Sequence, residues 1–151
     1  MEELTHTDNT GRARMIDTGA KPVQMRIAEA SGRINLLPTT LGLVRQNLLK
    51  KGDVLTVAEV AGIQAAKKCG ELIPLCHNIP LDHVAVTLTT DEQGITAHSS
   101  VRCTGRTGVE MEALTAVSVA LLTVYDMCKA VDKTMTITAI RLIKKEKHDI
   151  A

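Results

Sequence analysis

One long segment, residues 109–131, constrains the fold more than any other part of the sequence. Its apolar residues recur at helical spacing and share one broad face, which predicts a helix packed against a core. The small alanines on this face favour a close approach to a neighbouring sheet. The face comprises Ala113, Ala116, Val117, Ala120, Leu121, Val124, Met127, Cys128 and Val131.

The opposite arc of the same helix combines polar residues with the apolar Val119 and Leu122. Asp126 and Lys129 are three residues apart on this arc, so their side chains would lie next to each other. Such a pair is often only a surface ion pair, which contributes little to stability. The apolar neighbours allow a second interpretation, in which the arc is covered and the pair belongs to a site. The polar residues of the arc are Glu112, Thr115, Thr123, Asp126 and Lys129.

Composition limits the functions that the chain can serve. The 151 residues suffice for one domain, and 44% of them are hydrophobic, so the chain is expected to be globular. The net charge of +1 provides no field that would attract nucleic acid or an anionic membrane. Tyr125 is the only residue of the Phe, Trp and Tyr group, which argues against stacking on nucleic-acid bases.

The cysteines and the N-terminal residues indicate a reduced setting. The polar start of the chain has no signal peptide, so we expect free thiols and a cytoplasmic location. Adjacent Cys76 and His77 would struggle to bind one ion, so we expect no metal site. The longest uncharged run of the main helix, residues 113–125, is shorter than the roughly 20 residues of a membrane span. The four cysteines have no CxxC spacing: Cys69, Cys76, Cys103 and Cys128.

Periodicity and chain breakers predict the remaining elements. Residues 1–20 are polar and broken by glycines, which predicts a mobile N-terminal arm before a single catalytic domain over residues 21–151. Helical spacing predicts helices over residues 39–50 and 53–68, the second capped by Asp53. Two prolines interrupt residues 71–80, which we expect to form a defined loop. Alternating patterns predict strands over residues 23–36, 83–90, 95–104 and 134–145.

The order of these elements predicts the fold class. A strand, a pair of helices, two strands, a helix and a strand give an α+β, ferredoxin-like arrangement. In it, a four-stranded antiparallel sheet carries its helices on one face. Ser31-Gly32 could bulge or interrupt the first strand. The exposed sheet faces leave room for a second copy, so we also expect an oligomer.

Side chains able to bind anions or move protons lie at the ends of these elements. Several cations could hold phosphates, and nearby carboxylates could transfer protons. The turn at residues 105–108 could present backbone N–H groups to a phosphate, although this motif is weak. His77, taken alone, is more often a structural loop histidine. The residues by themselves therefore indicate an anion-binding enzyme or a ligand-binding module.

Three long motifs carry a resemblance to a known family. The chain contains KGDVLTVAEVAGIQAAKK at residues 51–68, LIPLCH at residues 72–77 and TGRTGVEMEALTAVSVALLTVYDMCKAVDK at residues 104–133. This combination closely resembles the MoaC family, the cyclic pyranopterin monophosphate synthases of molybdenum cofactor (molybdopterin) biosynthesis. The likeness extends over nearly the whole chain, from Thr5-His6 through the final strand.

The resemblance implies a lyase of the phosphorus–oxygen type without a metal or organic cofactor. Its substrate would be (8S)-3',8-cyclo-7,8-dihydroguanosine 5'-triphosphate, a GTP-derived nucleotide made by an upstream radical S-adenosylmethionine enzyme. The products would be cyclic pyranopterin monophosphate and diphosphate. The resemblance also implies a homohexamer, a trimer of dimers, with active sites at subunit interfaces.

The resemblance assigns roles position by position. Asp126, Lys129 and Lys51 match the catalytic residues. Substrate contacts match two segments, which contain Leu75, Cys76 and His77, and Met111 and Glu112. Five further positions are expected to line the pocket: Arg26, Glu110, Lys67, Arg102 and Lys145.

Two features depart from the family pattern. Asn78 stands where a proline usually follows the Cys-His pair, so this loop is expected to be less rigid. Residues 146–151 replace the usual Gly-Gly-Lys-Ser-Gly tail, which puts a tail contact with phosphate in doubt.

Two other functions stand as alternatives. A ferredoxin-like regulatory module would bind a nucleotide without converting it, and it would not depend on Asp126. RNA binding on the sheet is disfavoured by the missing aromatic residues and the weak net charge. Conversion of the cyclised nucleotide to a pterin with release of diphosphate would distinguish the enzyme from both.

Overall fold

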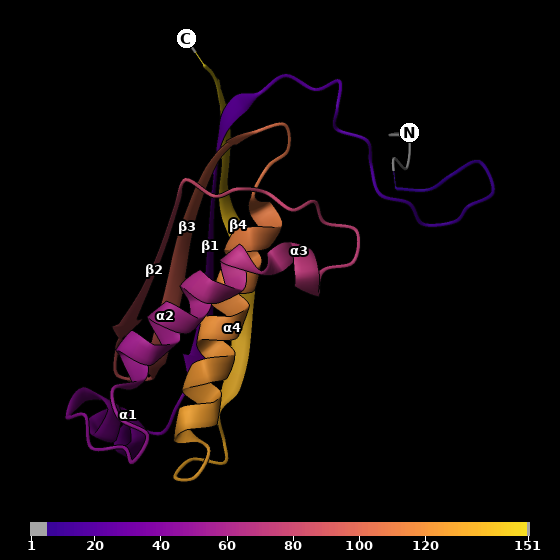
Figure 1. The fold of residues 1–151 in the computed structure, drawn as a ribbon. Helices are drawn as coiled ribbons and strands as arrows, with labels where there is room; N and C mark the ends of the chain where they lie inside the picture. Colours follow the sequence, from indigo (N-terminus) through magenta and orange to yellow (C-terminus); the bar gives the residue numbers. More distant parts are fainter. Residues whose placement is uncertain (1–5, 151) are drawn as a thin grey trace.

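The structure is a computed structural model that describes residues 6–150. It contains one four-stranded antiparallel sheet with its helices on one face (Figure 1). The strand order is β2-β3-β1-β4, so the predicted α+β, ferredoxin-like fold is confirmed. The elements are β1 (Gln24–Asn35), α1 (Pro38–Arg45), α2 (Val54–Lys67), α3 (Cys69–Leu72), β2 (His83–Thr90), β3 (Gly94–Gly105), α4 (Glu110–Cys128) and β4 (Thr136–Asp149).

Helix α4 packs closely on the central strand β1. A side chain at Gly32 would place its Cβ only 2.8 Å from atoms of both Val117 and Leu121, so the close approach requires glycine there. The predicted irregularity at Ser31-Gly32 is present on one side of β1 only. Register shifts interrupt the pairing of β1 with β4, whereas the pairing with β3 is continuous.

The predicted apolar face of α4 is buried, with one exception. Val131 is 50% exposed because the helix ends at Cys128. Glu112, on the opposite arc, is only 4% exposed, so this arc is covered near the start of the helix. By length and composition α4 could cross a membrane, but half of it is buried inside the fold, against α2 and the sheet. It is therefore the core helix of this domain.

Two helix boundaries have clear local causes. Helix α1 ends at Arg45, five residues before the predicted end, and Asn47 then adopts a positive φ of 55° that a helix cannot continue through. Helix α2 begins after Asp53, as predicted, because the Asp53 carboxylate accepts hydrogen bonds from the backbone N–H and the hydroxyl of Thr56.

The segment before β1 runs away from the sheet and helices (Figure 1). Its tip folds back on itself through a bridge between Thr7 and Ala13. Nearer to β1, the Lys21 carbonyl accepts a hydrogen bond from Arg106. The mobility expected for residues 1–20 stays a prediction, and residues 1–5 and 151 lie outside the described part of the chain.

Candidate functional site

The predicted site residues gather mainly at the two ends of α4. At the C-terminal end lie Lys51, Asp126 and Lys129, which we call the Asp126 cluster. Around the N-terminal end lie the residues that we call the Glu112 cluster: Lys67, Cys76, His77, Glu110, Glu112 and Lys145.

The Asp126 cluster is a carboxylate held between two ammonium groups. Oδ2 of Asp126 lies 2.6 Å from Lys51 Nζ, and Oδ1 lies 2.7 Å from Lys129 Nζ. Lys129 follows Asp126 by three residues, as the helical spacing predicted. Lys51 comes from the turn before α2, so the fold has brought together two of the three family motifs.

The side chains of the Asp126 cluster are more exposed than those of a covered site, and the pKa values of Asp126 and Lys129 are shifted accordingly. The three side chains are 51–56% exposed in the single chain. Hydrogen bonds from Lys129, first, and from Lys51 lower the pKa of Asp126 to about 2. Burial in a covered site would lower the pKa of a lysine. Instead, the hydrogen bond to the Asp126 carboxylate raises the pKa of Lys129. Both groups are therefore charged at neutral pH.

Asp132 fixes the chain segments that carry this cluster. Its buried carboxylate accepts hydrogen bonds from the Leu37 N–H and the Thr40 hydroxyl at the start of α1. It also accepts from the N–H and the hydroxyl of Thr134 before β4. Burial would raise the pKa of Asp132, but these hydrogen bonds outweigh it and lower the pKa. Asp132 thus connects the end of α4 to the helix that leads toward Lys51.

Glu112 faces a cavity of about 210 Å³ at the other end of α4. Burial raises the pKa of its carboxyl group, and the nearby Glu110 adds to this effect. Lys67, at the end of α2, also lines the cavity, and so does Asn78 of the proline loop. The cavity therefore combines a carboxyl group with a raised pKa, an ammonium group and an amide.

The Cys76 thiol lies in the field of the Glu112 carboxylate. Burial, first, and then Glu112 raise the pKa of Cys76, so this cysteine is a neutral thiol rather than a nucleophile. The buried Cys69, which was not among the predicted site residues, is a second neutral thiol at this position. Burial raises its pKa to about 11, and its sulfur lies 3.6 Å from the Thr115 hydroxyl.

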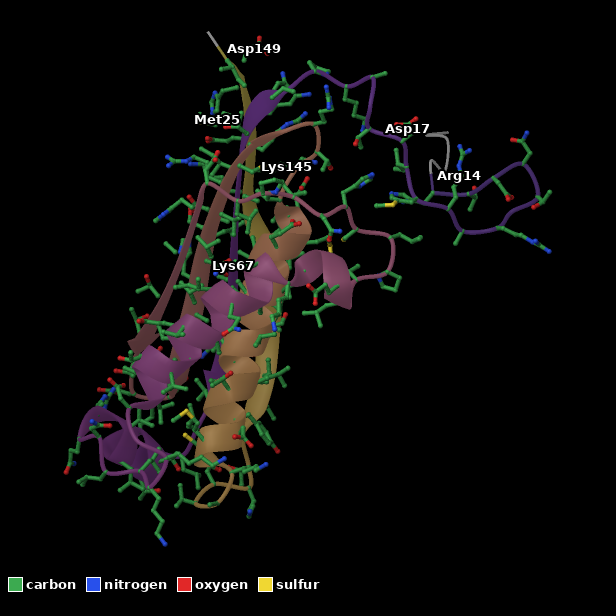
Figure 2. All side chains as sticks on the ribbon, in the orientation of Figure 1. Arg14, Asp17, Met25, Lys67, Lys145 and Asp149 are labelled. Atoms are coloured by element: carbon green, nitrogen blue, oxygen red, sulfur yellow. The ribbon has the colours of Figure 1, made fainter. Side chains whose placement is uncertain are left out.

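Lys145 of β4 forms an ion pair with Glu110 at the start of α4. Figure 2 shows Lys145 near this end of the helix and Lys67 at the end of α2. A Cβ at Gly108 would meet the Glu110 carboxylate, so the glycine leaves room for that carboxylate to fold back over the backbone. Arg26 of β1 donates to the Arg106 carbonyl at 3.4 Å, while its buried Nε has no hydrogen-bond partner.

Besides Arg26, three predicted residues are not part of either cluster. Leu75 and Met111 are exposed on the surface. Arg102 is directly opposite Ile27 of β1, and facing residues of an antiparallel pair share one side of the sheet. Because the neighbouring Ala28 is buried under the helices, Arg102 lies on the face away from them. One chain does not bring Arg102 to Lys67.

The two clusters are also apart. Glu112 and Asp126 are separated by 14 positions of one helix, or about 21 Å at the usual rise per residue. A single nucleotide-derived ring system cannot contact both within one chain. Within residues 6–150, no group of three or more His, Cys, Asp or Glu side chains is placed to hold a metal ion.

Sequence reasoning missed two further features of the site. The first is the set of hydrogen bonds accepted by the Asp132 carboxylate. Part of it could have been predicted, because an Asp two residues before a Thr is typical of a turn capped by a side chain. The second is the contact between His77 and the backbone of Ile16, at 2.6 Å, which could not have been predicted, because a backbone carbonyl leaves no trace in the residue types.

Comparisons with known proteins show the family of this chain. The family model of the MoaC family matches residues 15–148. The chain is 58% identical over 147 residues to cyclic pyranopterin monophosphate synthase of Chloroflexus aggregans, covering 96% of this chain and 89% of the relative. The enzyme of the same name from Thermomicrobium roseum is also 58% identical over 147 residues, with the same coverage.

A eukaryotic relative matches over a smaller share of its own length. Molybdenum cofactor biosynthesis protein 1 of Drosophila melanogaster is 54% identical over 145 residues, which cover 95% of this chain and 26% of that protein. The matches span all the motifs that carry the Asp126 and Glu112 clusters. The chain belongs to the MoaC family.

Proposed function

We propose that this chain is a cyclic pyranopterin monophosphate synthase of molybdenum cofactor biosynthesis. The observation that carries the proposal is the position of Asp126 between Lys51 and Lys129 in a member of the MoaC family. The proposed reaction converts (8S)-3',8-cyclo-7,8-dihydroguanosine 5'-triphosphate to cyclic pyranopterin monophosphate and diphosphate. An upstream radical S-adenosylmethionine enzyme would supply the substrate, and the reaction would take place in the cytoplasm.

The pKa shifts at the two ends of α4 suit such a reaction. Rebuilding a purine nucleoside into a pyranopterin requires protons to be delivered and removed at several ring positions. Groups whose pKa values are shifted in opposite directions can divide this work, because one holds its proton while the other has lost it. Glu112, with a raised pKa, and Asp126, with a lowered pKa, form such a pair. Lys51 and Lys129 would stabilise negative charge that develops on the substrate.

The phosphate groups of the substrate need cations, and the Glu112 cluster supplies them. Lys67 lines the cavity, and Lys145 and Arg26 lie nearby on β4 and β1. Charged hydrogen bonds to phosphate are the strong ones in proteins. Lys145 would exchange its partner Glu110 for a phosphate when the substrate binds.

We propose that the active site forms between subunits of a homohexamer, arranged as a trimer of dimers. The separation of about 21 Å along α4 supports this, because a second subunit could place its Asp126 cluster beside the Glu112 cluster of the first. Exposed apolar side chains of α4 provide surface for such a contact: Met111, Leu122 and Tyr125. Light scattering should give a multiple of the subunit mass, and a monomer at micromolar concentration would remove the interface site.

The direct test is incubation of the purified chain with the cyclised nucleotide made by the upstream enzyme. Diphosphate and a pterin should appear together with the wild-type chain. The competing function, a regulatory module that binds the nucleotide without converting it, predicts binding with no diphosphate. The Asp126→Asn variant distinguishes the two again, since only an enzyme needs this carboxylate.

A further inference from the structure

A backbone carbonyl of the N-terminal arm contacts the imidazole ring of His77. The Ile16 oxygen lies 2.6 Å from His77 Nε2. A carbonyl oxygen can only accept a hydrogen bond, so the ring nitrogen that faces it must carry the proton. In the neutral ring, the other nitrogen, Nδ1, then has no proton and is available as an acceptor.

Among the described residues, no hydrogen-bond partner competes for the unprotonated nitrogen of His77. Within residues 6–150, the His77 ring makes no hydrogen bond other than the one to Ile16. His77 lines a cavity of about 290 Å³, whose walls come from the arm, the proline loop and the turn after β3. The arm contributes Thr18, the chain just before β1 contributes Val23, and the turn contributes Arg106. The arm is thus a wall of the space beside His77.

The part of the arm next to His77 is held at both ends. At one end the Ile16 carbonyl meets His77, and at the other the Lys21 carbonyl accepts from Arg106 Nε at 3.2 Å. Arg106 is held in turn, because its own carbonyl accepts from Arg26 of β1. Residues 16–21, which we call the strap, therefore lie fixed between the proline loop and the sheet.

The tip of the arm contains its own local hydrogen bonds. The bridge between Thr7 and Ala13 and the hydrogen bonds accepted by the Asp8 side chain are internal to residues 7–13. Figure 2 shows Arg14 and Asp17 beyond the helices, where the chain turns from the tip toward the strap. Residues 1–10 can be deleted without removing Ile16, which separates the contribution of the tip from that of the strap.

We propose that the strap is a positioning element of the active site, whose Ile16 carbonyl holds His77 as the Nε2–H tautomer and directs Nδ1 to the substrate. The second half of this inference depends on the proposed function. A proton that leaves a substrate N–H or O–H would pass to Nδ1, giving an imidazolium and a substrate anion. The Nε2–H would stay on the Ile16 carbonyl, which stabilises the charged ring. The same proton returns to the substrate in a later step.

Nuclear magnetic resonance of isotope-labelled histidine tests the proposed His77 tautomer without any substrate. In the neutral His77 ring the proton should be on Nε2, and Nδ1 should carry none. This N–H should exchange slowly with water and couple to the Ile16 carbonyl carbon. The His77→Gln variant assigns the signal by its disappearance. A proton on Nδ1 in the wild-type chain would overturn the inference.

Two truncations separate the strap from the tip. Removal of residues 1–10 should preserve the slowly exchanging His77 signal, whereas removal of residues 1–17 should abolish it. Insertion of two glycines after Asp17, which slackens the strap without shortening the chain, should act like the longer truncation. Ile16→Ala keeps the backbone carbonyl, so this variant should preserve the slowly exchanging His77 signal, as removal of residues 1–10 does. A signal that persists in both the longer truncation and the insertion variant would contradict the proposal.

Kinetic measurements test whether the strap positions His77 Nδ1 for the reaction. The glycine insertion should lower kcat about tenfold with a smaller change in KM, the scale of one lost hydrogen bond. Removal of residues 1–10 should leave kcat within twofold of the wild-type value. Equal kcat in all variants, with the His77 signal lost in the insertion, would refute the catalytic role. Absence of turnover in the wild-type chain would refute the proposed function instead, and the resonance result would still decide the tautomer.

Discussion

Lys51 Nζ lies 2.6 Å from Oδ2 of Asp126, although 75 positions separate the two residues in the chain. The same ammonium group also lies 3.3 Å from the backbone carbonyl of Asp126. Lys51 therefore pairs with the carboxylate and also satisfies a carbonyl in the last turn of α4, where a cation is favoured by the helix dipole. The turn before α2 is thus part of the candidate site.

Asp126→Asn should abolish most activity while preserving the fold. The amide keeps the shape of the side chain but cannot act as a base, and it no longer neutralises the two lysines. Product formation should fall at least about a hundredfold, the usual scale for a lost general acid or base. The cyclised nucleotide should still bind. Diphosphate release, measured beside circular dichroism, checks both parts.

Asp91→Asn is the matched control for this substitution. Asp91 is also an exposed carboxylate, paired with Arg33 at 2.7 Å, but it belongs to the turn between β2 and β3. Its replacement removes an ion pair of the same kind without touching α4, so turnover should not change. If Asp126→Asn turned over normally, or failed only by unfolding, Asp126 would be a structural ion-pair partner.

The main features of the fold could be predicted because they depend on local spacing. The apolar face of α4, the Asp53 cap and the alternating strands are encoded by neighbours in the chain. The early end of α1 could not be predicted, since the apolar spacing continues past Arg45 to Leu48. The positive φ of Asn47 ends the helix there, and residue types alone do not fix that angle.

The site was less accessible to sequence reasoning because it depends on contacts between distant segments. A helical wheel places Glu112 on the arc of Asp126, but the cavity that buries Glu112 is built by α2 and the proline loop. Periodicity describes one helix and contains no information about what covers it. The resemblance named Lys51 and Asp126 together, whereas their direct contact required the structure.

Lys67→Ala should raise KM for the cyclised nucleotide more than it lowers kcat. A charged hydrogen bond to phosphate is worth about 1.5–3 kcal/mol, which corresponds to a rise in KM of roughly ten- to a hundredfold. Lys68→Ala, at the neighbouring exposed position, is the control and should have little effect. Added salt should also raise KM for the cyclised nucleotide in the wild-type protein, because it screens the attraction between Lys67 and phosphate.

Arg102→Ala tests whether a second subunit completes the site. Arg102 lies on the sheet face away from the helices of its own chain, so it can contact the substrate only across an interface. We expect a rise in KM of a similar size to that of Lys67→Ala. An unchanged KM in Arg102→Ala, with a raised KM in Lys67→Ala, would show that Arg102 is a surface residue.

Asp132→Ala should be among the more destabilising substitutions in this chain. It removes the acceptor of four hydrogen bonds and leaves the buried Thr40 hydroxyl unsatisfied. We expect a loss of about 2–4 kcal/mol in the free energy of unfolding, measured by denaturant titration. Thr40→Val removes only one of these bonds and should cost about 1 kcal/mol. Similar losses in both variants would mean that the Asp132 carboxylate contributes nothing beyond its bond to Thr40.

Glu112→Gln should make the protein more stable at neutral pH and inactive. Burial raises the pKa of Glu112, so the folded state is penalised when this carboxyl group ionises. A raised folded pKa means that stability is fully present below the unfolded value of about 4.3 and is lost as the pH rises through the folded pKa. Glutamine has the same shape and never ionises, so the variant avoids this loss.

The difference in melting temperature between Glu112→Gln and wild type should therefore depend on pH in a defined direction. It should be small below about pH 4, grow as the pH rises, and level off once Glu112 is ionised in the folded wild-type protein. Acid titration of other carboxylates, including Asp126, affects both proteins equally and cancels in the difference. Glu110→Gln is the comparison variant: it removes the ion pair with Lys145 and also one charge that raises the pKa of Glu112, so any gain at neutral pH should be smaller than that of Glu112→Gln. A Glu112→Gln variant less stable than wild type at pH 7 would mean that the ionised carboxylate is stabilised by its surroundings, and Glu112 would then lose its proposed role as the proton-holding partner of Asp126.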